Sequence, residues 1–216
     1  MKNKIFTSDE QDAIEQVIQL RRDVRGNHFI DKPIADETIQ RILSAAVCAP
    51  SVGFSQPWEF VIIRDKNVKS KVADIFSIEN EKAKAIFENS KPEYSQLKLE
   101  GIYEAPVNVA VFYKPSKDAV LGQTSMQNME EYSVVCAIQN MWLMSRALNV
   151  GLGWVSILDQ EKVKHALSAP LEAKLIAYLC IGYVDTFLDK PELETLRWSE
   201  RRSEDDFIHH DNWRHI

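Results

Sequence analysis

Residues 128–149 read NMEEYSVVCAIQNMWLMSRALN and predict a helix whose apolar side chains are distributed in an unusual way. A helix that is apolar on all sides is buried in the middle of a domain or at a subunit interface. Gly151 follows as a typical C-terminal stop. We therefore expect this helix at the centre of the fold. The apolar residues that cover nearly its whole circumference are Val134, Val135, Ile138, Met141, Trp142, Leu143 and Leu148.

Around this helix, short segments rich in β-branched and aromatic residues predict strands. The segment 175–184, LIAYLCIGYV, is continuously apolar, as in a strand that is buried on both faces. Helices come first and then alternate with strands, which favours one α+β domain with a central sheet. The strands are expected at 58–64, 106–113, 152–158 and 175–184, and the main helices at 8–22, 36–49, 68–89 and 128–149.

Local signals set the expected ends of these elements. Ser8 and Gln11 have the spacing of a capping box, while Asp36 and Asp159 are typical N-caps. After Asp189 the sequence carries charge without periodicity, which indicates an arm or tail. We expect one domain over residues 1–206 and a C-terminal tail over 207–216.

Composition excludes several classes of function. The 216 residues carry a formal net charge of -6, and this mild acidity argues against nucleic-acid binding, which depends on basic patches. No apolar run approaches the ~18 residues of a membrane span, and the acidic N-terminus lacks the apolar core of a signal peptide. We therefore expect a cytoplasmic protein without a membrane partner. Cys48, Cys136 and Cys180 lie far apart in apolar stretches, which predicts buried, unpaired side chains.

Standard motifs for nucleotide binding or hydrolysis are missing: the sequence holds no GxGxxG, GxxxxGK[ST], HExxH or GxSxG. Near the C-terminus, His209, His210, Asp211 and His215 have the chemistry of metal ligands. A flexible polar terminus is the better interpretation, because nothing there would preorganise those ligands. No metal is expected.

Two segments remain as candidates for chemistry. Residues 21–25, RRDVR, place three guanidinium groups around Asp23, a donor array suited to a phosphate or carboxylate, although arginines also stabilise the C-terminal end of a helix. Residues 49–58, APSVGFSQPW, describe a rigid loop whose free backbone N–H groups would suit a flat heteroaromatic edge. Judged locally, an ordinary connection is about as good an interpretation of that loop.

Taken together and in order, these segments resemble the nitroreductase-like flavoprotein superfamily. The similarity also includes the runs 104–106 (EAP), 151–156 (GLGWVS) and 178–185 (YLCIGYVD), and it extends from about residue 10 to about residue 202. Most superfamily members carry serine at the position of Asp23. The acid in RRD, the loop and GWVS together are most similar to the BluB group, the 5,6-dimethylbenzimidazole synthases.

The resemblance implies a nitroreductase-like α+β sandwich, with a mostly antiparallel central sheet flanked by helices. It further implies an intertwined homodimer in which each FMN lies between two subunits, so the apolar helix 128–149 would form the dimer core. Arg21, Arg22 and Arg25 would hold the FMN phosphate and nearby polar atoms, with Arg201 joining from the tail. The other flavin contacts implied are Asp23, Val24, Pro50, Ser51 and the backbone of Leu152 and Gly153, where a missing Cβ allows close approach to a flat ligand.

The BluB group uses reduced FMN as a substrate, which molecular oxygen and the enzyme convert to 5,6-dimethylbenzimidazole, the lower ligand of cobalamin. A separate NAD(P)H-dependent reductase supplies the reduced flavin. The resemblance assigns catalytic roles to Asp23, as a proton-transferring carboxylate, and to Ser156, as a hydroxyl that donates and accepts. A lid that excludes water is expected at 77–101 or at 116–131. Gln123, where the family has a basic residue, departs from the pattern, as do the two extra residues in GNHF after RRDVR.

Two other functions remain open. One is an NAD(P)H-dependent nitroreductase or flavin reductase of the same fold, and the other is a flavin-binding protein without catalysis. The acid at position 23 favours the synthase, because simple hydride transfer needs no carboxylate there.

Overall fold

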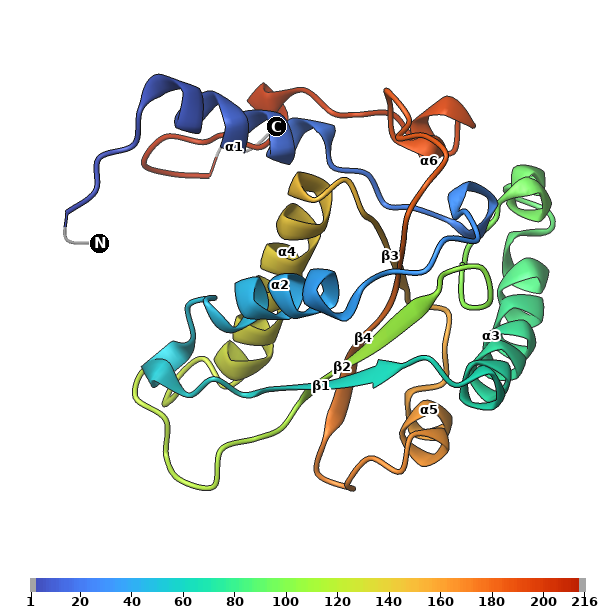
Figure 1. Ribbon diagram of the computed structural model, residues 1–216, viewed down its shortest axis with the longest axis horizontal. Coiled ribbons are helices and arrows are strands. Elements are labelled where there is room, and N and C mark those ends of the chain that lie inside the picture. The colour runs from blue at the N-terminus through green and yellow to red at the C-terminus, as the bar shows by residue number, and fades with distance from the viewer. Residues whose placement is uncertain (1–2, 214–216) are drawn as a thin grey trace.

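The fold of this chain is known from a computed structural model that describes residues 3–213. A four-stranded sheet forms its centre, with strand order β1-β2-β4-β3 and every neighbouring pair antiparallel (Figure 1). The α+β class and the antiparallel sheet are thereby confirmed. The strands are β1 Trp58–Ile63, β2 Val107–Tyr113, β3 Gly151–Val155 and β4 Lys174–Gly182.

Helices cover both faces of the sheet. One face packs against α2 and α4 and the other against α3 and α5, so two buried apolar clusters form, one on each side. β2 and β4 are buried along almost their whole length, as a central strand between two helical layers must be. The helices are α1 Ser8–Leu20, α2 Asp36–Val47, α3 Lys66–Phe87, α4 Met129–Ala147, α5 Gln160–Ala166 and α6 Glu192–Thr195.

Helix α4 occupies the expected place but is not buried on all sides. Ala137, Ile138 and Met141 are fully buried against the sheet and α2. Tyr132 and Val135, on the other side of the helix, remain 51% and 42% exposed. Within this chain, therefore, only one side of α4 is buried, and apolar side chains on its other side stay exposed.

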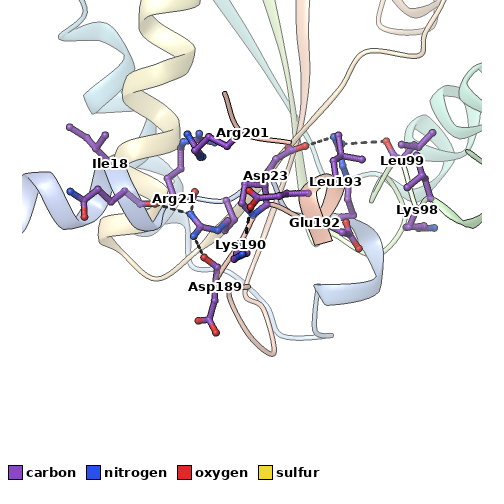
Figure 2. Close-up of a pocket in the computed structure, with 16 residues that line it drawn as sticks. Ile18, Arg21, Asp23, Lys98, Leu99, Asp189, Lys190, Glu192, Leu193 and Arg201 are labelled. Carbon is purple, nitrogen blue, oxygen red and sulfur yellow. Dashed lines mark hydrogen bonds and ion pairs between the residues drawn. The ribbon is translucent and has the colours of Figure 1, made fainter. Parts of the chain in front are cut away.

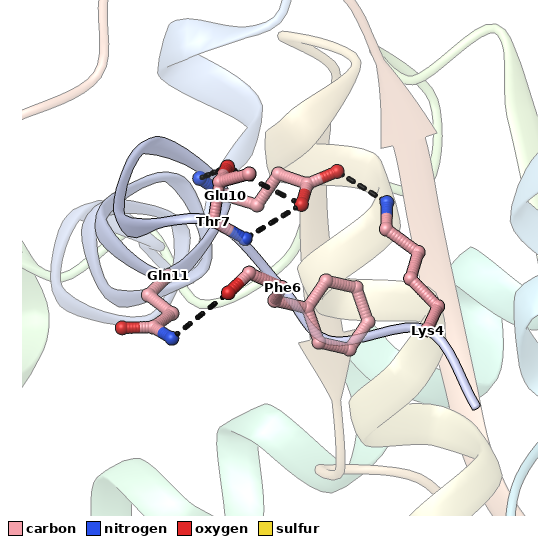
Figure 3. Close-up of polar contacts among 5 residues, drawn as sticks. All are labelled: Lys4, Phe6, Thr7, Glu10 and Gln11. Atoms are coloured by element: carbon pink, nitrogen blue, oxygen red, sulfur yellow. Dashed lines mark hydrogen bonds and ion pairs between the residues drawn. The ribbon is translucent and has the colours of Figure 1, made fainter.

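Two expected helix caps are displaced by one residue. At α1 the cap is Thr7 rather than Ser8: the Glu10 N–H donates to Thr7 Oγ1, and the Thr7 N–H donates to Glu10 Oε2 at 2.9 Å (Figure 3). Gln11 instead donates to the carbonyl of Phe6. Helix α2 begins at Asp36, and its N-cap Ala35 offers no side-chain hydrogen bond. Asp159 caps α5 as expected.

The arm after Asp189 is more ordered than its sequence indicated. It forms α6 and a short 3-10 turn, Glu204–Asp206, and runs along the side of the molecule that also carries α1 (Figure 1). The expected tail is described as far as Trp213, and the metal-ligand candidate His215 lies outside the described residues. Within residues 3–213, no helix is long and apolar enough to cross a membrane.

The cysteine prediction is wrong for two of three residues. Cys180 is fully buried in β4, but Cys48, which follows the last residue of α2, and Cys136 on α4 are exposed. The apolar residues next to them in sequence suggested burial, but both cysteines lie on a side of the helical layer that the sheet does not cover. None of the three forms a disulfide.

Candidate functional site

A cleft of about 730 Å³ opens beside the edge of the sheet, a volume suited to a ligand of nucleotide size. Residues 18–25 form one wall, residues 97–99 a second, and the arm at 189–194 with Arg201 a third (Figure 2). Three segments that are distant in the sequence therefore meet here. The basic side chains among the lining residues are Arg21, Arg22, Arg25, Lys98, Lys190 and Arg201.

The backbone at Asp23 is fixed by a short parallel pairing with β3. The Val24 N–H donates to the carbonyl of Leu152 at 3.1 Å, and Asp23 bridges to Leu152. Gly153 makes this pairing possible, because a Cβ added there would lie 2.0 Å from the Val24 carbonyl oxygen. The physical reason for glycine at 153 is thus the approach of the protein's own backbone.

The carboxylate of Asp23 is held from two sides. Its Oδ1 accepts the Trp154 N–H at 3.0 Å, and its Oδ2 forms an ion pair with Arg25. The side chain keeps 33% exposure. Burial of the remainder raises the pKa of Asp23 above its ordinary value, against the opposing charge of Arg25. A raised pKa makes this carboxylate a better proton acceptor than an ordinary aspartate.

Arg25 contacts Asp23 and its surroundings, whereas the other two arginines of RRDVR do not pair with this acid. Besides its ion pair with Asp23, its Nη1 donates to the carbonyls of Trp154 at 3.0 Å and Leu99 at 3.3 Å. These contacts anchor segment 97–99 to β3. Within this chain Arg25 is therefore engaged with protein groups, and its expected contact with FMN stays a prediction.

Arg21, Arg22 and Arg201 form a cationic cluster in which the charge of Asp189 opposes those of the neighbouring arginines only in part. Within residues 3–213, no carboxylate forms an ion pair with any of them. Burial, together with the charges of Arg21 and Arg201, lowers the pKa of Arg22. Among residues 3–213 the buried Nε of Arg22 finds no hydrogen-bond partner, while its Nη atoms donate to backbone carbonyls. An orphaned donor among like charges is the arrangement that an anion would stabilise.

Two tryptophans support this cluster. The Arg21 guanidinium lies 4.7 Å from the ring centroid of Trp142, a cation–π contact that holds it at the cleft. Trp142 Nε1 donates to the carbonyl of Arg22 at 3.1 Å, and its ring lies against Trp154, with centroids 6.3 Å apart. Helix α4 thus positions the arginines through a side chain predicted only as core.

The remaining expected site residues are not brought to the cleft. Pro50 and Ser51 precede the 3-10 turn Val52–Phe54, on the far side of α2 and α4 from α6 (Figure 1). There Ser51 Oγ accepts the N–H of Gln56 at 3.1 Å. The side chains of Val24 and Leu152 are buried in the core, and Ser156 is exposed just beyond β3 without lining the cleft.

Several residues that line the cleft were not singled out as site residues from the sequence. Leu97, Lys98 and Leu99 lie in one of the two candidate lid segments, and Lys98 pairs with Glu100 and Glu104. Lys190 and Glu192 come from the arm. Charged residues in loops are common everywhere, so only the way the three segments fold together distinguishes these.

The other candidate lid segment, 116–131, lies away from the cleft and is anchored to α4. The buried carboxylate of Glu130 accepts hydrogen bonds from Tyr113, Ser116 and Gln123, and the Glu130 N–H donates to Gln123 Oε1 at 2.9 Å. Gln123, the departure from the family pattern, is therefore part of this anchor.

Comparisons with known proteins agree with this fold. A family model described as the nitroreductase family matches residues 18–183. A 5,6-dimethylbenzimidazole synthase of Rhodospirillum rubrum is 44% identical over 201 residues, which cover 92% of this chain and 94% of that protein. One from Rhodobacter capsulatus is 36% identical over 198 residues, covering 90% and 95%.

Among solved structures, oxidised iodotyrosine deiodinase bound to FMN and 3-iodo-L-tyrosine superposes with a TM-score of 0.70. It is 22% identical, and the match covers 93% of this chain and 99% of that one. On the family match and the two synthase relatives, the chain belongs to the nitroreductase family.

Proposed function

We propose that this protein is a 5,6-dimethylbenzimidazole synthase, which takes reduced FMN as its substrate and fragments it with molecular oxygen. The similarity to proteins of that name spans nearly the whole of both chains. The observation that carries the proposal is the Asp23 carboxyl, held by Trp154 and Arg25 in the same cleft as the cluster of Arg21, Arg22 and Arg201. A simple flavin reductase has no use for that acid.

The cleft fits FMN in size and in charge. Its volume is within the range of nucleotide sites, and the cluster of Arg21, Arg22 and Arg201, with its orphaned Arg22 Nε, suits a phosphate. FMN, when bound, would supply both the ring that is broken and the electrons that reduce oxygen.

In this proposal Asp23 exchanges protons with the substrate, and Arg25 and the Trp154 N–H keep the carboxyl in place while it does so. Ser156 directly follows β3 and lies two residues after Trp154, whose backbone N–H holds the Asp23 carboxyl. We assign its hydroxyl to orient polar groups of the substrate.

The working unit would be a homodimer, in which the loop with Pro50 and Ser51 reaches the partner's flavin. Support comes from apolar side chains that this chain leaves uncovered: α1 buries no residue, and Ile14 and Ile18 are half exposed. The exposed side of α4 adds to that surface. Sedimentation should give twice the mass of the chain, and a monomer that still turns over would refute this part.

Of the two lid segments, we propose 77–101, because Leu97, Lys98 and Leu99 already line the cleft. A separate NAD(P)H-dependent reductase would supply reduced FMN, since the proposed reaction consumes it. We place this reaction in the cytoplasm, where three unpaired cysteines are stable as thiols.

The test is to incubate the purified protein with reduced FMN and air and to analyse the products by mass spectrometry. The proposal predicts 5,6-dimethylbenzimidazole in an amount that rises with protein concentration. Quantitative return of intact oxidised FMN would overturn it in favour of a flavin reductase or a flavin carrier. Nitroaromatic reduction with NAD(P)H then separates these two.

A further inference from the structure

The C-terminal arm is attached to the molecule by an aromatic cluster outside the cleft. Trp198 packs edge-on against Phe87, with ring centroids 5.3 Å apart, and lies 6.1 Å from Tyr94. Phe87 and Tyr94 are themselves stacked at 5.0 Å. Tyr94 is buried, and its hydroxyl donates to Asn80 Oδ1 at 2.8 Å, so the cluster is fixed to α3.

A lysine also contacts this tryptophan, through both its backbone and its ring. Lys91 Nζ donates to the carbonyl of Trp198 at 2.7 Å and lies 4.8 Å from the centroid of its ring. One side chain therefore binds both the backbone and the ring of Trp198, which restrains this residue more than apolar packing alone. We call Phe87, Lys91, Tyr94 and Trp198 the clasp.

From the clasp, two segments of the chain lead directly back to the cleft. Beyond Tyr94 the chain reaches Leu97, Lys98 and Leu99, which line one wall. Beyond Trp198 it reaches Arg201, which lies on the Arg21 side of the cleft, away from Lys98 and Leu99 (Figure 2). The clasp thus connects two walls of the site without touching it.

Arg201 depends on this attachment for its position. Across the described part of the chain its guanidinium has no hydrogen bond or ion pair, although its charge acts on Arg22. Before Arg201 the arm is held by Arg22 at the carbonyl of Asp189, by Asn27 at the carboxylate of Glu192, and by the clasp at Trp198. Of these contacts, only the clasp lies within three residues of Arg201.

We propose that Trp198 is a positioning residue for phosphate recognition: the clasp holds the arm so that Arg201 joins Arg21 and Arg22 at one anion. This inference rests on the proposed function, because it takes the anion to be the phosphate of FMN. A role limited to stability would weaken every flavin equally. The positioning role weakens only ligands that carry the phosphate.

The experiment compares FMN with riboflavin, which lacks the phosphate, by fluorescence titration of the purified protein. Trp198→Ala and Arg201→Ala should each raise the Kd for FMN about tenfold or more, the loss of one charge-assisted contact, and change the Kd for riboflavin less than about twofold. The double variant should bind FMN no more weakly than Arg201→Ala alone, because both substitutions remove the same contact, the one between Arg201 and the phosphate. Trp213→Ala, an exposed tryptophan of the same arm, is the matched control and should bind FMN normally.

Two further variants cover the case in which Trp198→Ala unfolds. Trp198→Phe keeps an aromatic ring in the clasp and should restore FMN binding to within about threefold, while Lys91→Met, which leaves the packing intact, should lose part of the FMN preference. Equal losses for FMN and riboflavin in these variants, or additive effects with Arg201→Ala, would overturn the inference.

Failure of the proposed function gives a different result. If the unaltered protein binds FMN and riboflavin equally well, there is no phosphate site, and the function and this inference both fall. If Arg201→Ala loses the FMN preference but the clasp variants retain it, only the inference falls.

Discussion

Replacing Gly153 with alanine tests the pairing that positions Asp23. The added Cβ would lie 2.0 Å from the carbonyl oxygen and 3.1 Å from the carbonyl carbon of Val24. Both are backbone atoms, so no side-chain rotation relieves the contact. Segment 23–25 must move away from β3 or β3 must bend.

The cost follows from what the movement disrupts. Overpacking in a tightly packed region costs ~1–3 kcal/mol. The hydrogen bonds from Val24 to Leu152 and from Trp154 to Asp23 each contribute about 1 kcal/mol. The free energy of unfolding should therefore fall by roughly 3–5 kcal/mol, which lowers Tm by about 6–20 °C for a chain of this size.

Denaturation in urea, followed by tryptophan fluorescence, measures the change. Gly26→Ala is the matched control, because its added methyl group meets the flexible side-chain ends of Lys98 and Glu104, which have room to turn. It should cost less than about 1 kcal/mol. If Gly153→Ala proves as stable as this control, the close approach of Val24 to β3 is wrong, and with it the placement of Asp23.

Three further predictions concern buried charge. Lys69 donates to the carbonyls of Ala105 and Pro106, so Lys69→Met should lower the free energy of unfolding by about 2 kcal/mol in urea titrations; no loss would contradict these contacts. Glu130→Gln should make residues 114–128 more sensitive to proteolysis, because their anchor is an ionised carboxylate, and unchanged cleavage would count against that anchor. The raised pKa of Asp23 means that the folded state binds its proton more tightly, so the stability of the unaltered protein relative to Asp23→Asn should fall as the pH rises above 3.8; a rise would show the wrong sign.

Much of the fold was predictable because periodicity and turn residues are local. The strands at β1, β2 and β4 and the cap at Asp159 follow from short-range pattern and were found within one or two residues. The cap of α1 was misplaced because Thr7 and Ser8 are chemically alike, and only the side-chain contacts of Glu10 choose between them.

The site was predictable in part, for a different reason. The three arginines around Asp23 lie so close together in the sequence that they stand out. Which of them pairs with the acid depends on β3, because Arg25 also donates to the Trp154 carbonyl in that strand. The exposure of Cys48 and Cys136 escaped detection because sequence shows that a helix face is apolar, not what covers it. Arg201 reaches the cleft through the clasp, a contact between residues more than a hundred positions apart.

The central claim is that the Asp23 carboxyl acts on reduced FMN within this cleft. The most direct measurement is the yield of 5,6-dimethylbenzimidazole from Asp23→Asn, with its Kd for FMN determined on the same preparation. Glu194→Gln, at an acid of the same cleft that pairs with Lys190, is the control. The account predicts that Asp23→Asn binds FMN within about threefold of the unaltered protein and forms no product, while Glu194→Gln forms it. Normal product formation by Asp23→Asn would contradict the account.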